Sequence, residues 1–155
     1  MKGNELVLKT LNDLLADELT AINQYMVHAE MCDNWGYAGL AEVIEKRAIT
    51  EMKHAEKHIA RILFLEGKPT VSVLNKINIG GDVLVQLQND HAAELGAISG
   101  YNKGIKQAAE LGDNGTREML QGILVDEEAH IDWIEAQLDQ INQMGIQLYL
   151  VEKSG

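Results

Sequence analysis

Apolar residues recur at steps of three and four over four long parts of the chain, the spacing typical of one face of an α-helix. The recurring residues run from Leu11 to Ala29, from Leu40 to Leu63, from about Val83 to Leu111, and from near Thr116 to Met144. A short tail, Ile146 to Val151, has room for one or two further helical turns. Each long helix, of roughly 28–30 residues, would span about 40–45 Å.

The links between these helices differ in length. Asn34-Trp35-Gly36 and Gly112 to Gly115 indicate short turns. The sixteen residues from Gly67 to Asp82 include Pro69 and Gly80-Gly81, which do not continue a helix, and a plain up-down bundle needs no link of this length. We therefore predict one all-α domain over residues 1–155, a ferritin-like four-helix bundle with a long crossover between helices 2 and 3 and a short C-terminal fifth helix.

Composition and charge narrow the class of protein. The formal net charge of −11, from 13 Lys and Arg against 24 Asp and Glu, argues against nucleic acid or an anionic membrane as the main partner. Hydrophobic residues make up 46% of the chain, enough to fill a core. A single cysteine, Cys32, excludes an internal disulfide framework. Because the chain has neither a signal-peptide pattern nor an apolar run long enough for a membrane helix, we expect a cytoplasmic protein.

Six carboxylate and imidazole side chains fall on helix faces that should be apolar. Glu18, for example, lies four residues from both Leu14 and Ile22. The six are Glu18, Glu51, His54, Glu94, Glu127 and His130. A buried carboxylate without a partner costs at least several kcal/mol, so the six groups need a shared partner. A pair of cations is the simplest one.

The spacing of these residues occurs twice. Glu51 follows Glu18 by 33 residues, and Glu127 follows Glu94 by 33. Each second member begins a Glu-x-x-His motif, which puts a carboxylate and an imidazole on one helix face. The two halves are offset by 76 residues, an offset that also pairs Leu19 with Leu95, Ile22 with Ile98, and Tyr25 with Tyr101. One such motif is usually part of a solvated face, but two at matched positions favour a site for two iron or manganese ions, with zinc also compatible.

These residues lie among motifs that resemble the bacterioferritins over almost the whole chain. The motifs are Ala21-Ile22-Asn23-Gln24-Tyr25, Asn34-Trp35-Gly36, Glu51-Met52-Lys53-His54-Ala55, Arg61 to Gly67, His130-Ile131-Asp132-Trp133 and Met144-Gly145. The resemblance implies iron storage and detoxification in a hollow homo-oligomeric shell of twenty-four subunits, which oxidises Fe(II) with O2 or H2O2 and stores a ferric mineral. It makes the six residues an intrasubunit di-iron ferroxidase centre with Glu51 and Glu127 bridging. Tyr25 lies beside this centre, for radical transfer or for core packing.

Met52 points about 100° away from the metal-binding face of its helix. Taken alone, a methionine on a helix surface is a packing residue or an oligomer contact. Bacterioferritins bind haem between two subunits through one such Met from each, so the resemblance implies haem b or a related iron porphyrin at a twofold interface. Leu19, Ile22, Asn23, Met26 and Ile49 would line the pocket. The haem would assist iron release, with a bacterioferritin-associated ferredoxin as the electron donor.

Other residues have less specific patterns. We expect His58 and His91 to support the site or to pack, and we expect His28 and Cys32 to bind no metal. Gly96, Gly100 and Gly104 form one stripe, which indicates close helix packing or a softer helix. The resemblance puts four residues in channels for iron uptake, although a solvated face explains them equally: Asn34, Glu66, Asp132 and Asp139.

The chain departs from the family at several positions. Lys46, Arg47 and Thr50 stand where many bacterioferritins have the His, Glu and Asp of an auxiliary iron site, and Glu45 stands where an aromatic residue is common beside the haem. We therefore expect no auxiliary iron site of that kind.

Two other functions share part of this pattern. A di-iron or dimanganese peroxidase or catalase would use the same ligands without a mineral-filled shell, and a haem-carrying or structural subunit would not oxidise iron by itself. A DNA-protecting cage is disfavoured, because its metal site lies between subunits and this chain has no basic arm.

Overall fold

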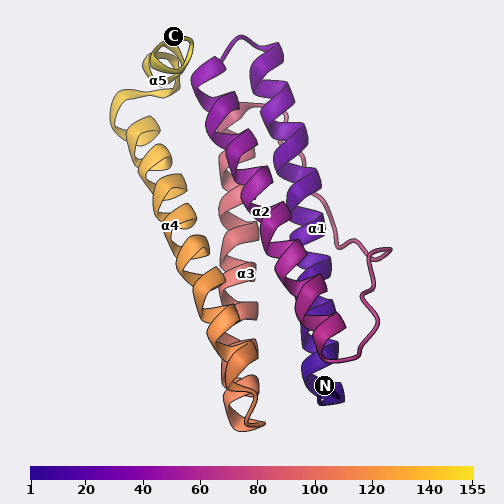
Figure 1. Ribbon diagram of the computed structural model, residues 1–155. Coiled ribbons are helices and arrows are strands. Elements are labelled where there is room, and N and C mark those ends of the chain that lie inside the picture. The colour runs from indigo at the N-terminus through magenta and orange to yellow at the C-terminus, as the bar shows by residue number, and fades with distance from the viewer.

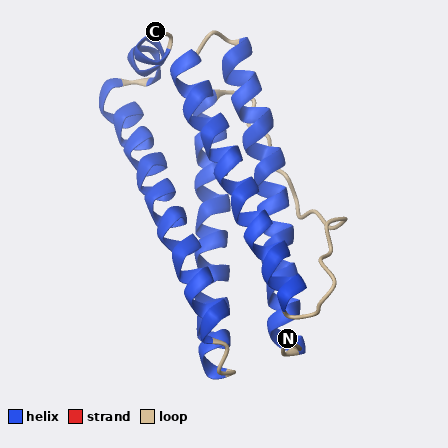
Figure 2. Ribbon diagram, viewed as in Figure 1, coloured by secondary structure: helices blue, strands red, loops and turns tan.

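The computed structural model describes residues 1–155 and contains helices but no strands. In chain order these are α1 (Glu5–Asn34), α2 (Ala38–Phe64), α3 (Val83–Glu110), α4 (Asn114–Met144) and α5 (Ile146–Lys153) (Figure 1). The predicted four-helix bundle, with its long link before α3 and its short fifth helix, is confirmed (Figure 2). No helix combines the length and the hydropathy that crossing a membrane requires.

Side-chain caps explain where three of the long helices begin. Asn4 accepts a hydrogen bond from the Leu6 amide at 2.8 Å, and Asp82 accepts one from the Val85 amide at 2.9 Å. Asp113 accepts one from the Thr116 amide at 3.0 Å, so α4 begins two residues earlier than the apolar pattern indicated. Each cap satisfies an amide that has no partner within its helix.

The helices form two antiparallel hairpins, α1 with α2 and α3 with α4 (Figure 1). The link from residue 65 to residue 82 runs back along the bundle, so that α3 starts at the end where α2 also starts and the two run in the same direction (Figure 1). Helix α5 folds across that end of the molecule. Its Tyr149 is fully buried and donates a hydrogen bond to Gln137 Oε1 at 2.7 Å.

A buried network fixes the crossover to the bundle. Asp90 of α3 accepts hydrogen bonds from Gln24 Nε2 at 2.8 Å and from His28 Nδ1 at 2.9 Å, both on α1. The other ring nitrogen of His28 accepts a hydrogen bond from the Gly80 amide at 3.0 Å. A Cβ atom at Gly80 would lie 2.3 Å from the Gln86 amide nitrogen, so this close approach requires glycine.

The apolar core consists of two clusters. One, with Tyr25, Leu40 and Tyr149 among its members, lies toward α5, and the other, with Leu11, Ile62 and Leu120, lies toward the N-terminus. Between them the bundle buries the carboxylates and imidazoles singled out by the sequence pattern. The fold therefore places a polar layer inside an otherwise hydrophobic bundle.

Candidate metal centre

Each of the four long helices contributes a glutamate to the polar layer. Helices α1 and α3 contribute one donor residue each, and α2 and α4 contribute a Glu-x-x-His pair each. The donors form two groups whose potential ligand atoms lie within 4.8 Å of one another: Glu18, Glu51, His54 and Glu127 in the first, and Glu51, Glu94, Glu127 and His130 in the second. All six residues are buried, and Glu51 and Glu127 belong to both groups. The geometry is that of two adjacent cation positions sharing two carboxylates.

Two tyrosines orient the unshared carboxylates. Tyr25 of α1 donates a hydrogen bond to Glu94 Oε1 of α3, and Tyr101 of α3 donates one to Glu18 Oε1 of α1. The two tyrosines that the 76-residue repeat relates therefore each bond to the glutamate of the other half of the chain. Burial first, and the neighbouring carboxylates second, raise the pKa of both phenols well above the usual value, so the two hydroxyl groups stay protonated and act as donors.

Each histidine of the two groups is held by a further side chain. His54 Nε2 donates to Asp126 Oδ2 at 2.9 Å, which turns Nδ1 toward Glu127 Oε1 at 3.2 Å. His130 Nδ1 donates to Glu94 Oε1 at 2.8 Å, and its ring stacks on Trp133. Asp126 belongs to neither donor group and is an outer partner that fixes the orientation of a ligating imidazole, whereas Glu94 is itself a donor of the second group.

Arg47 reaches the same carboxylates from α2. Its Nη2 donates to Glu127 Oε2 at 2.9 Å and forms an ion pair with Glu51 Oε1 at 2.7 Å. Glu51 Oε1 has no hydrogen-bond partner, so its contact with Arg47 is an ion pair without hydrogen-bond geometry. Glu94 Oε2 is 3.7 Å from the same nitrogen. A guanidinium group therefore sits against the second donor group.

The acidity of these groups is strongly perturbed. Burial raises the pKa of Glu51 and of Glu127 well above the usual carboxyl value, although His54 opposes the shift in both. Burial alone would also raise the pKa of Glu94, but the hydrogen bond from His130 and the charge of Arg47 outweigh it and lower that pKa. For His54, burial favours the neutral ring, yet Glu127, Glu18 and Glu51 raise its pKa to about 12. The carboxyl groups of Glu51 and Glu127 therefore favour the protonated form unless further cations lie beside them.

The donor set fits a pair of divalent metal ions. Several buried atoms in the layer have no hydrogen-bond partner: Glu18 Oε2, Glu51 Oε1, Glu94 Oε2, Glu127 Oε1 and His54 Nδ1. Buried polar atoms are almost always satisfied, and these five belong to residues of the two donor groups. Mixed carboxylate and imidazole donors, without a thiolate, suit iron, manganese or zinc.

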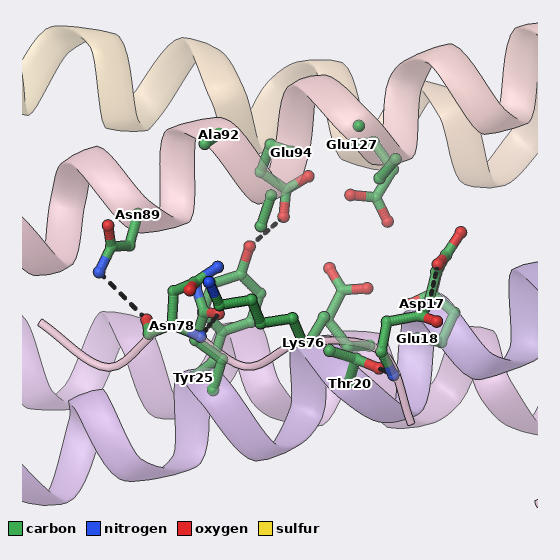
Figure 3. A pocket seen from close by; sticks show the side chains of 17 residues that line it. Asp17, Glu18, Thr20, Tyr25, Lys76, Asn78, Asn89, Ala92, Glu94 and Glu127 are labelled. Carbon is green, nitrogen blue, oxygen red and sulfur yellow. Dashed lines mark hydrogen bonds between the residues drawn. The ribbon is translucent and has the colours of Figure 1, made fainter. Parts of the chain in front are cut away.

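A cavity of about 330 Å³ leads to this layer from the side of α1, α3 and the crossover. Its lining includes Glu18, Glu51, Glu94 and Glu127 together with Lys76 and Asn78 of the crossover. Figure 3 shows Glu94 and Glu127 pointing into the space between the helix pairs, with the Tyr25 hydroxyl group reaching Glu94. The glutamates are therefore reachable from outside although each is buried.

The residues expected around a haem lie on a different face. Met52 and Met26 are 45% and 50% exposed, and Ile49 is exposed beside them. Leu19, Ile22 and Asn23 are partly buried. Apart from Asn23 these side chains are apolar, and each of the two helices carries one exposed methionine. Glu45 is exposed on the same helix as Met52.

The remaining residues of the sequence analysis lie outside the centre or beside it. His58 Nε2 donates to the Tyr101 oxygen at 2.7 Å, and Tyr101 in turn donates to Glu18, so His58 supports Glu18 through Tyr101. His91 pairs with Glu135 near the surface. His28 belongs to the crossover network, and Cys32 is buried. The expected channel residues are all exposed: Asn34, Glu66, Asp132 and Asp139.

Sequence reasoning missed three contacts of the centre. Arg47 was treated only as a departure from the family, although it lies four residues before Glu51 and thus on the same helix face. Tyr101 was matched to Tyr25 by the repeat, but its bond to Glu18 was not inferred. Asp126, the partner of His54, had no distinguishing signal in an acidic helix.

Comparisons with known proteins agree over nearly the full length. Residues 8–144 match the family model described as a ferritin-like domain. The chain is 40% identical over 149 residues to a bacterioferritin of Mycolicibacterium paratuberculosis, covering 96% of this chain and 94% of that protein. It is also 40% identical over 147 residues to a bacterioferritin of Rhodobacter capsulatus, covering 95% of this chain and 91% of that protein. To a bacterioferritin of Brucella melitensis it is 38% identical over 149 residues, covering 96% of this chain and 92% of that protein.

Proposed function

Because this chain belongs to the bacterioferritins of the ferritin-like family, we propose that it is an iron-storing ferroxidase. It oxidises Fe(II) to Fe(III) at the buried carboxylate layer and passes the product to a ferric mineral inside a shell of many copies. The observation that carries this proposal is the pair of four-residue donor groups that share Glu51 and Glu127. A solvated acidic face would not be buried and would not leave five buried ligand atoms without hydrogen-bond partners.

The reaction needs two Fe(II) ions side by side. Each gives up one electron, and dioxygen takes both electrons with two protons to form H2O2; if H2O2 is the oxidant, two electrons and two protons convert it to two water molecules. The shared carboxylates of Glu51 and Glu127 hold the ions adjacent, so that both electrons are available at one place. Their negative charge favours the more highly charged product, Fe(III).

The other residues set the geometry of this reaction. Glu18 and Glu94 each keep one oxygen free for iron, because Tyr101 donates to the other oxygen of Glu18 and Tyr25 to the other oxygen of Glu94. His54 and His130 supply one imidazole to each position. The cavity beneath the crossover, which reaches the four glutamates, is the route that we assign to Fe(II) and the oxidant.

The ferroxidase assignment is tested by Glu127→Ala, with Glu128→Ala as the matched control. Glu127 is buried in both donor groups, whereas Glu128 is exposed beside it on α4. We expect Glu127→Ala to slow rapid aerobic Fe(II) oxidation by about 100-fold or more, because one shared ligand of both positions is lost. Glu18→Ala should behave similarly, and Glu128→Ala should oxidise Fe(II) at the wild-type rate. Stopped-flow absorbance of ferric species measures the rate, and equal rates in all four proteins would reject the assignment.

We further propose that the exposed face of α1 and α2 binds haem between two copies of the chain. Two exposed methionines and the neighbouring apolar side chains support this, since a large apolar patch on a soluble protein usually marks an interface. Haem bound there would supply electron transfer toward stored Fe(III), with Met52 as the ligand. An external reductant such as a small ferredoxin would provide the electrons for release.

Met52→Leu and Met26→Leu separate the haem ligand from its surroundings. Both variants keep an apolar side chain, but only the first removes the proposed ligand. We expect Met52→Leu to lose or shift the Soret band of reconstituted protein and Met26→Leu to keep it, with Fe(II) oxidation unchanged in both. Loss of the band in Met26→Leu alone would assign the ligand to the other helix. Electron microscopy of the same samples tests the shell, since a free di-metal peroxidase or catalase would form none.

A further inference from the structure

The two donor groups differ in their relation to Arg47. Its Nη2 lies 2.7 Å from Glu51 Oε1 and 2.9 Å from Glu127 Oε2, on the two shared carboxylates, and 3.7 Å from Glu94 Oε2, which only the second group contains. The other oxygens of the shared pair, Glu51 Oε2 and Glu127 Oε1, face His54 of the first group. It has no such contact with Glu18, the carboxylate that only the first group contains. The side chain is only 10% exposed, so this is a buried cation among buried anions.

The internal repeat makes the asymmetry clear. At the position 76 residues after Arg47, in the other half of the chain, stands Ile123, which is fully buried in the apolar core. The donors, the tyrosines and the Glu-x-x-His motifs all match between the halves, whereas this position does not. One half therefore has a fixed positive charge where its counterpart has a hydrocarbon side chain.

We propose that Arg47 is a tethered cation that competes with metal for the second position, so that the two positions fill in sequence. The position of Glu18 and His54 fills first. The position of Glu94 and His130 fills second and more weakly, because its metal must displace the guanidinium. This inference rests on the metal centre proposed above and adds an order of binding to it.

Charge and geometry both require displacement. A metal ion ligated by the second group would draw on the carboxylate oxygens that Arg47 now contacts, and ligand oxygens lie about 2 Å from such an ion. An arginine cannot release its proton to escape this repulsion, because its guanidinium stays charged in proteins. Two divalent ions already balance four carboxylates, so a retained guanidinium would leave a buried excess of positive charge.

The surroundings of Arg47 provide a place for it to move. The cavity that leads to the glutamates is lined mainly by α1, α3 and the crossover, and Arg47 does not line it. It enters instead from α2 beside α4, where its Nη1 already donates to the Asp126 carbonyl at 3.4 Å. The carboxylate of Asp126 is 48% exposed on that side. A metal arriving through the cavity can therefore push the guanidinium toward α4 without blocking its own path.

The test is an anaerobic titration with Co²⁺, which reports binding through its visible spectrum and is not oxidised in the process. Wild-type protein, Arg47→Gln and Lys46→Gln are compared after removal of metal with a chelator. Lys46 is the matched control because it carries the same charge one residue away, but it is 73% exposed and pairs with Glu42 at 3.1 Å.

We expect wild-type protein to bind Co²⁺ in two unequal steps. Arg47→Gln should tighten the second step by about tenfold or more and leave the first nearly unchanged. Lys46→Gln should follow the wild-type curve. Superimposable curves for wild type and Arg47→Gln would overturn the inference, as would an equal shift in Lys46→Gln, which would show only the effect of net charge. If none of the three proteins bound Co²⁺ tightly, the metal centre itself would be contradicted.

A second measurement does not depend on the order of binding. Without metal, Arg47→Gln should unfold at a lower temperature than wild type, because three buried carboxylates lose their cation. With saturating Co²⁺ the difference should disappear or reverse. If Arg47→Gln is too unstable to purify without metal, Arg47→Lys replaces it, because it keeps the charge but not the guanidinium fork. Its second Co²⁺ should then bind more tightly than in wild type, but less tightly than at a position without a competing cation.

Discussion

Asp113 has two structural roles at the start of α4. Its carboxylate accepts hydrogen bonds from the Thr116 amide at 3.0 Å and the Thr116 hydroxyl group at 2.6 Å, which cap the helix. It also accepts one from Arg61 Nη2 at 2.9 Å, which ties the end of α2 to α4. Burial alone would raise the pKa of Asp113, but the bonds from Thr116 and Arg61 outweigh it and lower that pKa.

Asp113→Ala should therefore destabilise the fold by about 1 kcal/mol, the usual value of a lost helix cap. Because the folded pKa lies below the unfolded one, the ionised group stabilises the fold at neutral pH, and this stabilisation is lost as the pH falls through the folded pKa. Thermal unfolding of wild type and Asp113→Ala at pH 7 and at pH 3 measures the effect. The difference between the two proteins should shrink at pH 3, and a pH-independent difference would show that the charge contributes nothing.

The three glycines of the stripe on α3 differ in how closely neighbouring helices pack against them. A Cβ atom at Gly104 would lie 3.2 Å from Leu120 Cδ1 and 3.3 Å from Thr10 Cγ2, and one at Gly100 would lie 3.3 Å from Leu14 Cδ2. At Gly96 nothing lies within 4 Å. Close packing, one of the two sequence interpretations of this stripe, therefore holds for Gly100 and Gly104, whereas Gly96 only makes the helix softer.

Gly96→Ala and Gly104→Ala should consequently have different effects. Gly96→Ala should raise the free energy of unfolding by about 1 kcal/mol, since alanine restricts the unfolded chain and meets no neighbour in the helix. Gly104→Ala should gain less or lose stability, because Leu120 and Thr10 must move. Thermal unfolding midpoints of the two variants decide the matter. An equal rise in both would mean that the neighbours of Gly104 adapt freely.

At the scale of the whole molecule, we expect the buried polar layer to make stability depend on metal. The bundle interrupts its two hydrophobic clusters with four carboxylates, two of which have raised pKa values because of burial. The two clusters hold the helices together on either side of a layer that opposes folding unless cations neutralise it.

Adding Co²⁺ to chelator-treated protein should therefore raise the midpoint of thermal unfolding. At a free metal concentration 100 times the dissociation constant, one site adds about 2.7 kcal/mol to the free energy of unfolding. Excess chelator should reverse the change. Glu127→Ala serves as the control, because it lacks a ligand of both positions and should respond far less. A rise of the same size in that variant would place the stabilising metal elsewhere.

Sequence alone determined the helices and the crossover, and it predicted that the six candidate donor residues are buried. The apolar period of a helix is local, and a glutamate on that stripe must enter the core, so Glu18 and Glu94 could be found without coordinates. Only the tertiary structure decided which groups meet across helices. The contacts of Tyr101 with Glu18, His54 with Asp126, and Arg47 with Glu127 join residues 72 to 83 positions apart, and no periodic pattern specifies such distances. The asymmetry between the two proposed metal positions was likewise decided only by the tertiary structure, because it depends on where one long, charged side chain lies.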